Sequence, residues 1–291
     1  MYFVRVFLGV FIFSCTLSML AFLKSVARQS PFILGTHKKI KKILIYPLTF
    51  TSLDILQLEK VPFRDFFNPK KLRLLKTVRP YTKNGYGRLT NVYDLAHEIE
   101  RRKVEGAFVE CGVWKGGLCA VMAAVAHEFG DRRTTWYLDS FEGMPKVASP
   151  HDGEGTEEIA GDVLKADVKD VEEVVFQKLR LPRECNKIIK GWFEETLPRV
   201  KSDIGQIAIL RLDADWYEGT KLILDELYDQ VIPGGYLIFD DYGRWVGSRK
   251  AADEFLASRN ISPELQFIGS IDGPKGEIRM APMYFQKPES R

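Results

Sequence analysis

The chain has few of the residues that build disulfide frameworks or zinc sites. Its 291 residues include only four cysteines and four histidines. The cysteines form no CxxC motif and stand at no zinc-type spacing from histidine; they are Cys15, Cys111, Cys119 and Cys185. The sequence therefore argues against a zinc-binding module and predicts free, buried thiols, which suit a reducing compartment.

A strong charge of one sign is also missing. The formal net charge is +3, and part of it comes from one cluster, Lys38–Lys42. The rest of the chain has no basic stripe with interleaved aromatic residues, so we expect no nucleic-acid partner. With 45% hydrophobic and 28% charged residues, the composition is typical of a globular protein with one main domain and an appendage.

The appendage is predicted at the N-terminus, where Val6–Leu23 carries no charge. Its length is at the lower edge of the roughly 17–25 residues that cross a bilayer as a helix. Lys24, Arg28 and the cluster Lys38–Lys42 follow it, against Arg5 alone before it. This excess of positive charge predicts an apolar helix that anchors the chain once in a membrane, with the main domain on the cytoplasmic side.

The alternative for residues 1–29 is a cleaved signal peptide, with Ser25-Val26-Ala27 as the cleavage site and a secreted or lumenal product. A Golgi-type anchor with a lumenal domain shares the same layout. Residues 30–79 are interpreted as a connecting helical region. In it, the basic and amphipathic Lys70–Val78 lies either along a membrane surface or over the edge of the main domain. The main domain is predicted over residues 80–291.

The main domain alternates short apolar runs with amphipathic segments, which predicts an α/β fold with about seven strands. The expected strands are Gly106–Cys111, Thr134–Leu138, Lys187–Lys190, Ile207–Leu212, Tyr236–Phe239, Leu265–Ile268 and Pro282–Gln286. The expected helices include Leu89–Lys103, one ending near Phe129, Asp167–Leu179, Thr220–Val231 and Val246–Ala257. Pro233-Gly234-Gly235 is expected to end the helix before it and to turn the chain.

Acidic residues follow two of these strands. Asp213 and Asp215 come after Ile207–Leu212, and Asp240-Asp241 come after Tyr236–Phe239. A strand–helix–strand unit of this length is a parallel crossover, so both clusters are expected at the same edge of the sheet. Converging carboxylates repel each other unless they are protonated or bridged. Asp213, Asp240 and Asp241 therefore predict a Mg²⁺ site, against the alternative of helix caps or solvated turns.

A second pattern indicates a nucleotide-type cofactor. The first strand ends in Glu110 and is followed by the glycine-rich turn Gly112–Gly117 and a helix. The next strand ends in Asp139, where an acid can hold the two hydroxyls of a ribose. The turn lacks the GxGxxG spacing, which argues against a dinucleotide-dependent oxidoreductase. Residues 146–165 form a long polar connection that is a candidate active-site lid, and its His151 is a candidate general base.

Several stretches together resemble one family. They are FVECGVWKGG (Phe108–Gly117), LDSFEGMP (Leu138–Pro145), KGWFEETLP (Lys190–Pro198), RLTNVYDL (Arg88–Leu95), and LRLDADWYEGT through GGYLIFDDYG (Leu210–Gly243). The chain is similar to the macrocin and mycinamicin sugar O-methyltransferases. The resemblance runs from about Pro80 to Gln286. It implies a Rossmann-like, mostly parallel seven-stranded sheet with helices on both faces, and S-adenosylmethionine as the cofactor.

The resemblance also implies roles for individual residues. It places Glu110, Gly112 and Gly117 at the methionine part of the cofactor, Asp139 and Ser140 at the ribose, and Gly191 and Trp192 at the adenine, with Thr82 closing over it. Asp213, Asp240 and Asp241 match the Mg²⁺ ligands. The metal would hold two vicinal sugar hydroxyls and lower the pKa of one, and Asp213 or a neighbour would take its proton.

The expected function is therefore metal-assisted methylation of a hydroxyl on a sugar or glycan-type acceptor. The apolar N-terminus sets the chain apart from the soluble enzymes of this family and suggests a glycan or lipid-linked sugar. The same fold acting on a phenolic or lipid hydroxyl is the first alternative. A membrane-tethered scaffold that binds the cofactor without turnover is the second. A homo-oligomer is compatible with all three, and neither the acceptor nor the position methylated follows from the residues.

Overall fold

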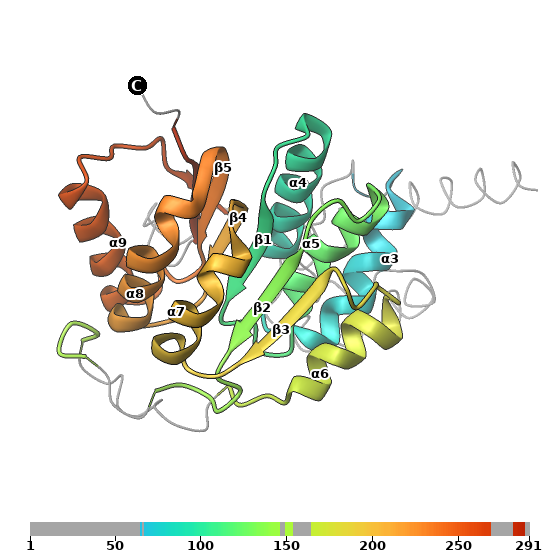
Figure 1. Ribbon diagram of the computed structural model, residues 1–291, viewed down its shortest axis with the longest axis horizontal. Helices are drawn as coiled ribbons and strands as arrows, with labels where there is room; N and C mark the ends of the chain where they lie inside the picture. The colour runs from blue at the N-terminus through green and yellow to red at the C-terminus, as the bar shows by residue number, and fades with distance from the viewer. Residues whose placement is uncertain (1–64, 66, 146–148, 154–163, 269–281, 289–291) are drawn as a thin grey trace, which may run out of the picture. The chain divides into compact units, whose positions relative to one another are not determined.

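The computed structural model describes residues 65, 67–145, 149–153, 164–268 and 282–288. In this part of the chain seven strands form one sheet in the order β3-β2-β1-β4-β5-β7-β6 (Figure 1). The strands are β1 (Ala107–Cys111), β2 (Thr135–Asp139), β3 (Asn186–Lys190), β4 (Ile207–Leu212), β5 (Val231–Phe239), β6 (Gln266–Phe267) and β7 (Met283–Gln286). The seven predicted strands are confirmed, with boundaries that shift by a few residues.

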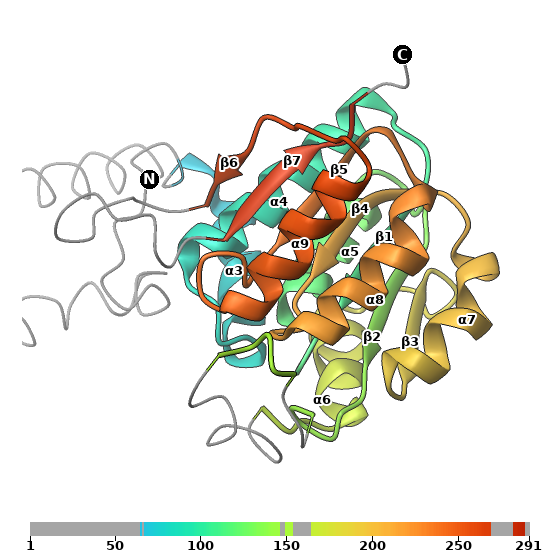
Figure 2. The same cartoon turned by 90° about the vertical axis from the view of Figure 1, so that its left-hand side faces the viewer.

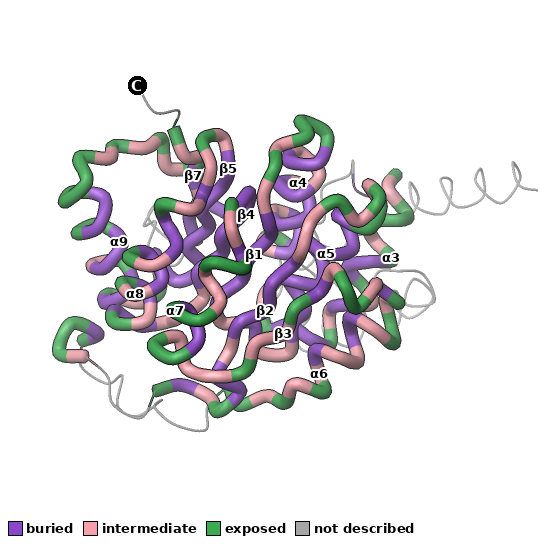
Figure 3. The backbone as a smooth tube through the Cα atoms, in the orientation of Figure 1, coloured by how far each residue is buried: buried purple, intermediate pink, exposed green. Residues whose placement is uncertain are grey.

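The sheet is mostly parallel. β1 pairs in parallel with β2 and β4, β2 with β3, and β4 with β5, whereas β7 runs antiparallel to both β5 and β6. Every residue of β1 and β4 is buried, as expected for central strands covered on both faces. Figure 3 shows the buried residues concentrated along these central strands. Both strands are mostly apolar, with one charged residue each, which is why they were predictable.

Helices cover both faces of the sheet (Figure 2). The bounds are α3 (Pro69–Val78), α4 (Tyr86–Arg102), α5 (Gly117–Glu128), α6 (Val168–Glu172), α7 (Phe193–Ile204), α8 (Tyr217–Leu227) and α9 (Val246–Ser258). α4 and α5 pack against each other on one face, and α8 packs with α7 and α9 on the other. The Rossmann-like prediction for the main domain is confirmed in this arrangement.

Helix α3 resolves the choice left open for Lys70–Val78. Leu74, Leu75 and Val78 are buried, and α3 packs against α5. Lys71 is only 2% exposed and forms ion pairs with Asp65 at 3.3 Å and Asp94 at 3.0 Å. This segment therefore covers the main domain, and the charge of Lys71 is neutralised by internal ion pairs.

One local prediction in the second half of the chain is wrong. Pro233-Gly234-Gly235 does not turn the chain between elements, because it lies inside β5. The β4–β5 register jumps there from Ile207↔Val231 to Ile209↔Tyr236, so the three residues form a bulge. The helix before them ends at Leu227, and residues 228–230 form a 3₁₀ turn.

One helix was not predicted, and another differs in its type. α7 was not predicted, because Pro198 is a helix breaker in its interior. The helix forms around it with Glu194 and Glu195 in its first turn, where acids are favourable, and with Leu197 and Ile204 buried. The helix predicted over Asp167–Leu179 is α6 followed by a π-helical stretch over residues 173–178.

The predicted N-terminal apolar helix, Val6–Leu23, lies outside the described residues. Within the described ranges, no helix combines the length and the apolar character needed to cross a membrane. The anchor, the signal-peptide alternative, the membrane side and the three-part division of the chain therefore stay predictions.

Candidate active site

A cavity of about 600 Å³ opens at the carboxyl ends of β1, β2, β4 and β5. Among the residues that line it are Thr82, Arg88, Glu110, Gly112, Trp114, Asp139, Ser140, Trp192, Asp213, Asp215, Trp216, Asp240, Asp241, Arg244 and Trp245. This is the edge where parallel α/β sheets bind ligands, because the loops after the strands meet there. The cavity brings together both acidic clusters and the glycine-rich turn.

The glycine-rich turn after β1 is held by close backbone contacts. Gly112 has a φ of 90°, and a Cβ there would lie 1.8 Å from the carbonyl oxygen of Asp213. A Cβ on Gly117 would lie 2.6 Å from the carbonyl oxygen of Tyr81. The glycines are therefore required where chain segments meet, not only where a ligand approaches. Gly112 lines the cavity, whereas Gly117 lies under Tyr81 and is not among the lining residues.

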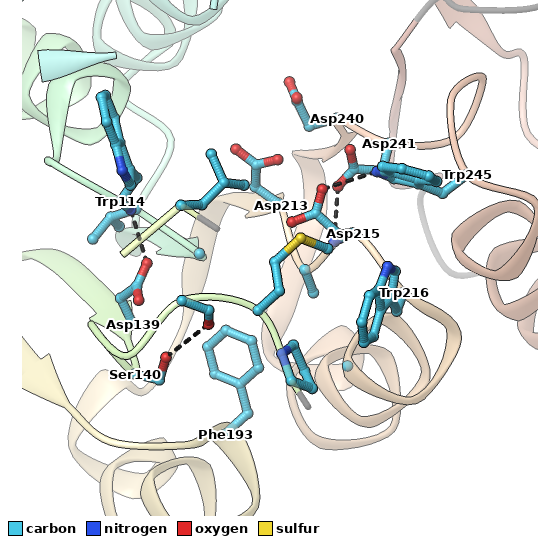
Figure 4. Close-up of a pocket in the computed structure, with 18 of the residues that line it drawn as sticks. Trp114, Asp139, Ser140, Phe193, Asp213, Asp215, Trp216, Asp240, Asp241 and Trp245 are labelled. Atoms are coloured by element: carbon cyan, nitrogen blue, oxygen red, sulfur yellow. Dashed lines mark hydrogen bonds between the residues drawn. The ribbon is translucent and has the colours of Figure 1, made fainter. Parts of the chain in front are cut away.

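Asp139, at the end of β2, holds the glycine-rich turn and the loop after β2 by hydrogen bonds. This part of the cavity, which contains the predicted cofactor residues, is called the cofactor half. Asp139 Oδ2 accepts the Trp114 N–H at 2.8 Å, and Asp139 Oδ1 accepts the Phe141 N–H at 2.7 Å (Figure 4). Burial raises the pKa of Asp139, although these backbone donors oppose the shift. Each carboxylate oxygen keeps a further lone pair, so the side chain can accept from ribose hydroxyls as well.

The remaining residues predicted for the cofactor divide into two groups. Thr82, Ser140 and Trp192 line the cavity with Glu110 and Asp139. Gly191 does not; its φ is 142°, and a Cβ there would lie 2.8 Å from the side chain of Thr196. The assignments to ribose, adenine and methionine stay predictions.

The acidic half of the cavity is formed by the ends of β4 and β5. Asp213, Asp240 and Asp241 each offer a carboxylate oxygen, and these oxygens lie within 4.8 Å of one another. Asp241 Oδ2 also accepts the Asp215 N–H at 2.9 Å, and Asp215 Oδ1 accepts the Trp245 Nε1–H at 2.9 Å. Figure 4 shows Asp213, Asp215 and Asp241 turned toward the same point. The convergence predicted for Asp213, Asp240 and Asp241 is confirmed by these oxygen–oxygen distances, whereas their role as metal ligands stays a prediction.

A buried arginine supplies much of the counter-charge. Arg211 in β4 is 1% exposed and forms ion pairs with Glu110, with Asp240 and, at 2.8 Å, with Asp213. Arg88 from α4 reaches Asp240 at 2.8 Å from the other side. The sequence argument that the carboxylates require an external cation is therefore incomplete. The signal was present in the sequence as the single charge in an otherwise apolar strand.

Burial still dominates the protonation of the acids. It raises the pKa of Glu110 to about 8, of Asp215 to about 7 and of Asp240 to about 6. The pKa of Asp241 is raised well above its usual value by burial and by the neighbouring carboxylates. Arg211 lowers the pKa of Glu110 and of Asp240, but the effect of burial outweighs it.

The acidic cluster fits a hard divalent cation. Its donors are carboxylate oxygens from two strand ends, and burial with mutual repulsion favours a positive charge between them. The Asp241 carboxylate accepts only the Asp215 N–H among the contacts of the described residues, whereas the carboxylates of Asp213 and Asp240 are paired with arginine. Asp241 therefore has the most coordination capacity left.

Tryptophans line the cavity on both sides, with Trp114 beside Asp139, and with Trp216 and Trp245 on the side of Asp215 (Figure 4). Four of the chain's five tryptophans line the cavity, namely Trp114, Trp192, Trp216 and Trp245. Trp216 is 3% exposed, and its buried Nε1–H has no hydrogen-bond partner in the described part of the chain. Arg244 stands at the rim, 5.0 Å from the centre of the Trp245 ring. The sequence analysis assigned none of Trp216, Trp245 and Arg244.

His151 is placed differently from the other candidates. Its ring packs on Tyr217 with centroids 4.4 Å apart, and it is exposed and not among the residues that line the cavity. The structure brings its neighbours Ser149 and Asp152 to the cavity instead. A catalytic role for His151 stays a prediction without support from this geometry.

Comparison with known proteins agrees with this site. Residues 69–273 match the family model of Macrocin-O-methyltransferase (TylF), so the match begins with α3, upstream of the Pro80 expected from the sequence motifs. Demethyldecarbamoylnovobiocin O-methyltransferase of Streptomyces niveus is 37% identical over 64% of this chain and 71% of that protein. Mycinamicin III 3''-O-methyltransferase of Micromonospora griseorubida is 31% identical over 64% of this chain and 74% of that protein.

Solved structures show the same relationship. The O-methyltransferase NovP is 33% identical, with a TM-score of 0.61, over 72% of this chain and 83% of that chain. A calicheamicin methyltransferase is 20% identical, with a TM-score of 0.57, over 82% of this chain and 90% of that chain, and this likeness concerns the fold alone. The chain belongs to the macrocin O-methyltransferase family and is an S-adenosylmethionine-dependent O-methyltransferase.

Proposed function

We propose that the protein transfers a methyl group from S-adenosylmethionine to a hydroxyl of a sugar, with a divalent cation bound at Asp213, Asp240 and Asp241. The observation that carries this proposal is the single cavity that joins Asp139 and the glycine-rich turn to the acidic cluster. The names of the relatives support a sugar acceptor, since one acts on the 3''-position of mycinamicin III and another on the 4'-position of a rhamnosyl tetracenomycin.

The cofactor half contributes binding and orientation. Asp139 holds the turn at Trp114 and Phe141 through its two oxygens, and it faces the cavity with lone pairs for ribose hydroxyls. Glu110 Oε2 is buried without a hydrogen-bond partner in the part of the chain described here, so it is available to an amino group. When bound, S-adenosylmethionine would supply the methyl group by in-line displacement at the methyl carbon, with S-adenosylhomocysteine as the leaving group.

Asp215 is the proposed general base, in place of Asp213. Asp213 is held by Arg211 and belongs to the cation site. Asp215 lines the same cavity two residues on, in a left-handed conformation with a φ of 58°. Its backbone is fixed by Asp241 and its side chain by Trp245. It is therefore positioned to take the proton that the acceptor hydroxyl releases as the new C–O bond forms.

The part of the cavity beside Trp216 and Trp245 suits a sugar. The C–H faces of a pyranose are apolar and pack on indole rings, and Trp216 and Trp245 line the cavity beside Asp215. The Trp216 Nε1–H is a free donor for a sugar oxygen, which would satisfy a buried polar group. A bound cation would lower the pKa of the attacking hydroxyl.

The test uses the full chain, with calorimetry for the cofactor and labelled S-adenosylmethionine for transfer. We expect micromolar binding of S-adenosylmethionine, no binding of NAD, and Mg²⁺-dependent methylation of methyl 6-deoxyhexopyranosides such as methyl α-L-rhamnopyranoside. Catechol serves as the phenolic comparison. Absence of S-adenosylmethionine binding with and without Mg²⁺ would overturn the proposal, and methylation of catechol alone would replace the sugar acceptor with a phenolic one.

A further inference from the structure

Residues 149–153 dock on the amino-terminal ends of α8 and α9, far from their own position in the sequence. We propose that Asp152 is a positioning residue, which sets the acceptor half of the cavity by holding this stretch against the first turns of both helices. The inference rests on the proposed function, because it concerns the same acceptor. Asp152 is not needed for the cofactor half, which is formed by other strand ends.

The contacts of Asp152 are specific. Its side chain is buried, with 3% of the residue exposed. Oδ1 accepts the N–H of Tyr217, the first residue of α8, at 2.7 Å, and Oδ2 accepts the Ser149 N–H at 2.8 Å. The Asp152 N–H donates to the Ser149 carbonyl oxygen at 2.9 Å. One carboxylate thus satisfies a free amide of a helix terminus and closes its own short loop.

Two further contacts join the stretch to α8. The His151 ring packs on the Tyr217 ring at 4.4 Å, and Ser149 Oγ lies 3.3 Å from Glu218 Oε1. These contacts lie on the surface of α8, whereas the Asp152 bond is buried. This explains His151 without catalysis, as part of the docked stretch.

Gly247, in the first turn of α9, lies directly against Asp152. Asp152, Gly247 and the Tyr217 N–H are together called the clamp. A Cβ at Gly247 would lie 1.8 Å from Asp152 Oδ1 and 3.1 Å from Asp152 Cα. No side chain fits there while the carboxylate stays in place, so the buried Asp152 requires Gly247. The Asp152 side chain therefore accepts a hydrogen bond from the amino end of α8 and packs against the amino end of α9.

This clamp acts on the reaction through the start of α8. Trp216 immediately precedes Tyr217 and lines the cavity, as do Ser149 and Asp152. If the Tyr217 amide loses its acceptor, the turn that carries Trp216 and Asp215 is no longer tied to residues 149–153. The acceptor would then bind less well, whereas S-adenosylmethionine would bind as before.

Five variants of the full chain test this: Asp152→Ala, Asp152→Asn, Gly247→Ala, the double variant Asp152→Ala/Gly247→Ala, and Val246→Ala as a control. Val246 is 67% exposed and lies in the same turn of α9 without taking part in the clamp. We measure KM for methyl α-L-rhamnopyranoside, Kd for S-adenosylmethionine, and NMR hydrogen exchange of the Trp216 and Tyr217 amides. Cofactor binding and circular dichroism show that each variant is folded.

We expect KM to rise at least about tenfold, and both amides to exchange at least about tenfold faster, in each single variant, with Kd for the cofactor unchanged. The double variant should be no worse than either single one, because the methyl group added at Gly247 no longer meets a carboxylate. Asp152→Asn should give a KM and exchange rates between those of the wild type and those of Asp152→Ala, since it keeps an acceptor for Tyr217 but not for Ser149. Val246→Ala should match the wild type.

Unchanged exchange of both amides in the single variants, or faster exchange with an unchanged KM, would overturn the inference. Effects that multiply in the double variant would also overturn it, because they would show that the two residues act separately. The exchange measurement needs no acceptor, so it tests the clamp even if no sugar is methylated. Absence of sugar methylation by the wild type would count against the proposed function and not against the clamp.

Discussion

Glu110 and Arg211 are register partners on the adjacent parallel strands β1 and β4, and their side chains form an ion pair in which neither is more than 2% exposed. Arg211 also reaches Asp213 and Asp240. One guanidinium therefore connects the predicted cofactor side of the cavity to the predicted cation side. Removing it would affect both sides and the stability of the sheet.

The first prediction concerns this arginine. Arg211→Met should lower the free energy of unfolding by about 3–5 kcal/mol, because it leaves buried carboxylates without their cation. Urea unfolding measures the loss. Adding Glu110→Gln should recover part of it by removing one of the stranded charges. Arg244→Met, at the exposed rim, is the control and should change stability by less than about 0.5 kcal/mol. A loss below about 1 kcal/mol in Arg211→Met would contradict the ion-pair account.

The second prediction concerns the cofactor. Asp139→Ala should raise the Kd for S-adenosylmethionine at least about tenfold, since hydrogen bonds to a charged acceptor contribute about 1.5–3 kcal/mol each. Calorimetry measures it. Asp131→Asn, before β2 at the opposite edge of the sheet, is the matched control and should bind as the wild type does. If Asp139→Ala binds S-adenosylmethionine as tightly as the wild type does, Asp139 does not contact the ribose.

The third prediction concerns the general base. Asp215→Asn should lower kcat by about 10²–10⁴-fold, the usual range for loss of a general base, with little change in the Kd for S-adenosylmethionine. The variant keeps an oxygen that can accept from Trp245 Nε1–H, so the local structure should persist. Single-turnover methyl transfer separates this effect from product release. Near-normal turnover would point back to Asp213 or to another acceptor of the proton.

The fourth prediction concerns the cation. Methyl transfer should be abolished by a chelator and restored by Mg²⁺, while S-adenosylmethionine binding continues in both conditions. Asp241→Asn should reduce transfer more than about tenfold, because Lewis-acid stabilisation amounts to several kcal/mol. Titration with Mg²⁺ should show a higher requirement in this variant. Full activity in the presence of chelator would exclude a metal role for the acidic cluster.

The fifth prediction concerns pH and lies outside the site. Burial lowers the pKa of His97, which packs between Tyr93 and Phe129. The folded protein then binds this proton less tightly than the unfolded chain does, so stability should fall as the pH drops below about 6.5. His97→Gln should lose less stability than the wild type between about pH 7.5 and pH 5.5 in urea unfolding. Parallel curves for the two proteins would show that His97 does not contribute.

The parts of the fold that were predictable share one physical basis. β1, β4 and the end of β5 are buried on both faces, so their sequences are mostly apolar, interrupted by Glu110 in β1 and by Arg211 in β4. Acids that directly follow such strands must meet at one edge, which placed Asp213, Asp240 and Asp241 correctly. Gly112, Asp139 and Ser140 reached the cavity for the same reason.

What was not predictable depends on contacts between distant segments. Arg211 has partners on β1 and after β5, and Asp152 meets Gly247 from a distant part of the chain. The lone charge in an apolar strand marks Arg211 itself, but no local pattern identifies its partners or those of Asp152. α7 was missed because a local rule about Pro198 was overridden by the burial of Leu197 and Ile204. Gly117 and Gly191 were assigned to a ligand, although each is explained by a close contact with another part of the chain.

The contact between Gly112 and the Asp213 carbonyl oxygen limits how such an enzyme can be redesigned. The two residues belong to different strand ends, one on the methyl-donor side and one on the acidic side, and they touch through their backbones. Any side chain introduced at Gly112 would move Asp213 and thereby disturb both ligand sites at once. Efforts to accept a different sugar should therefore leave this junction intact and vary Trp216, Trp245 and Arg244, which line the proposed acceptor half.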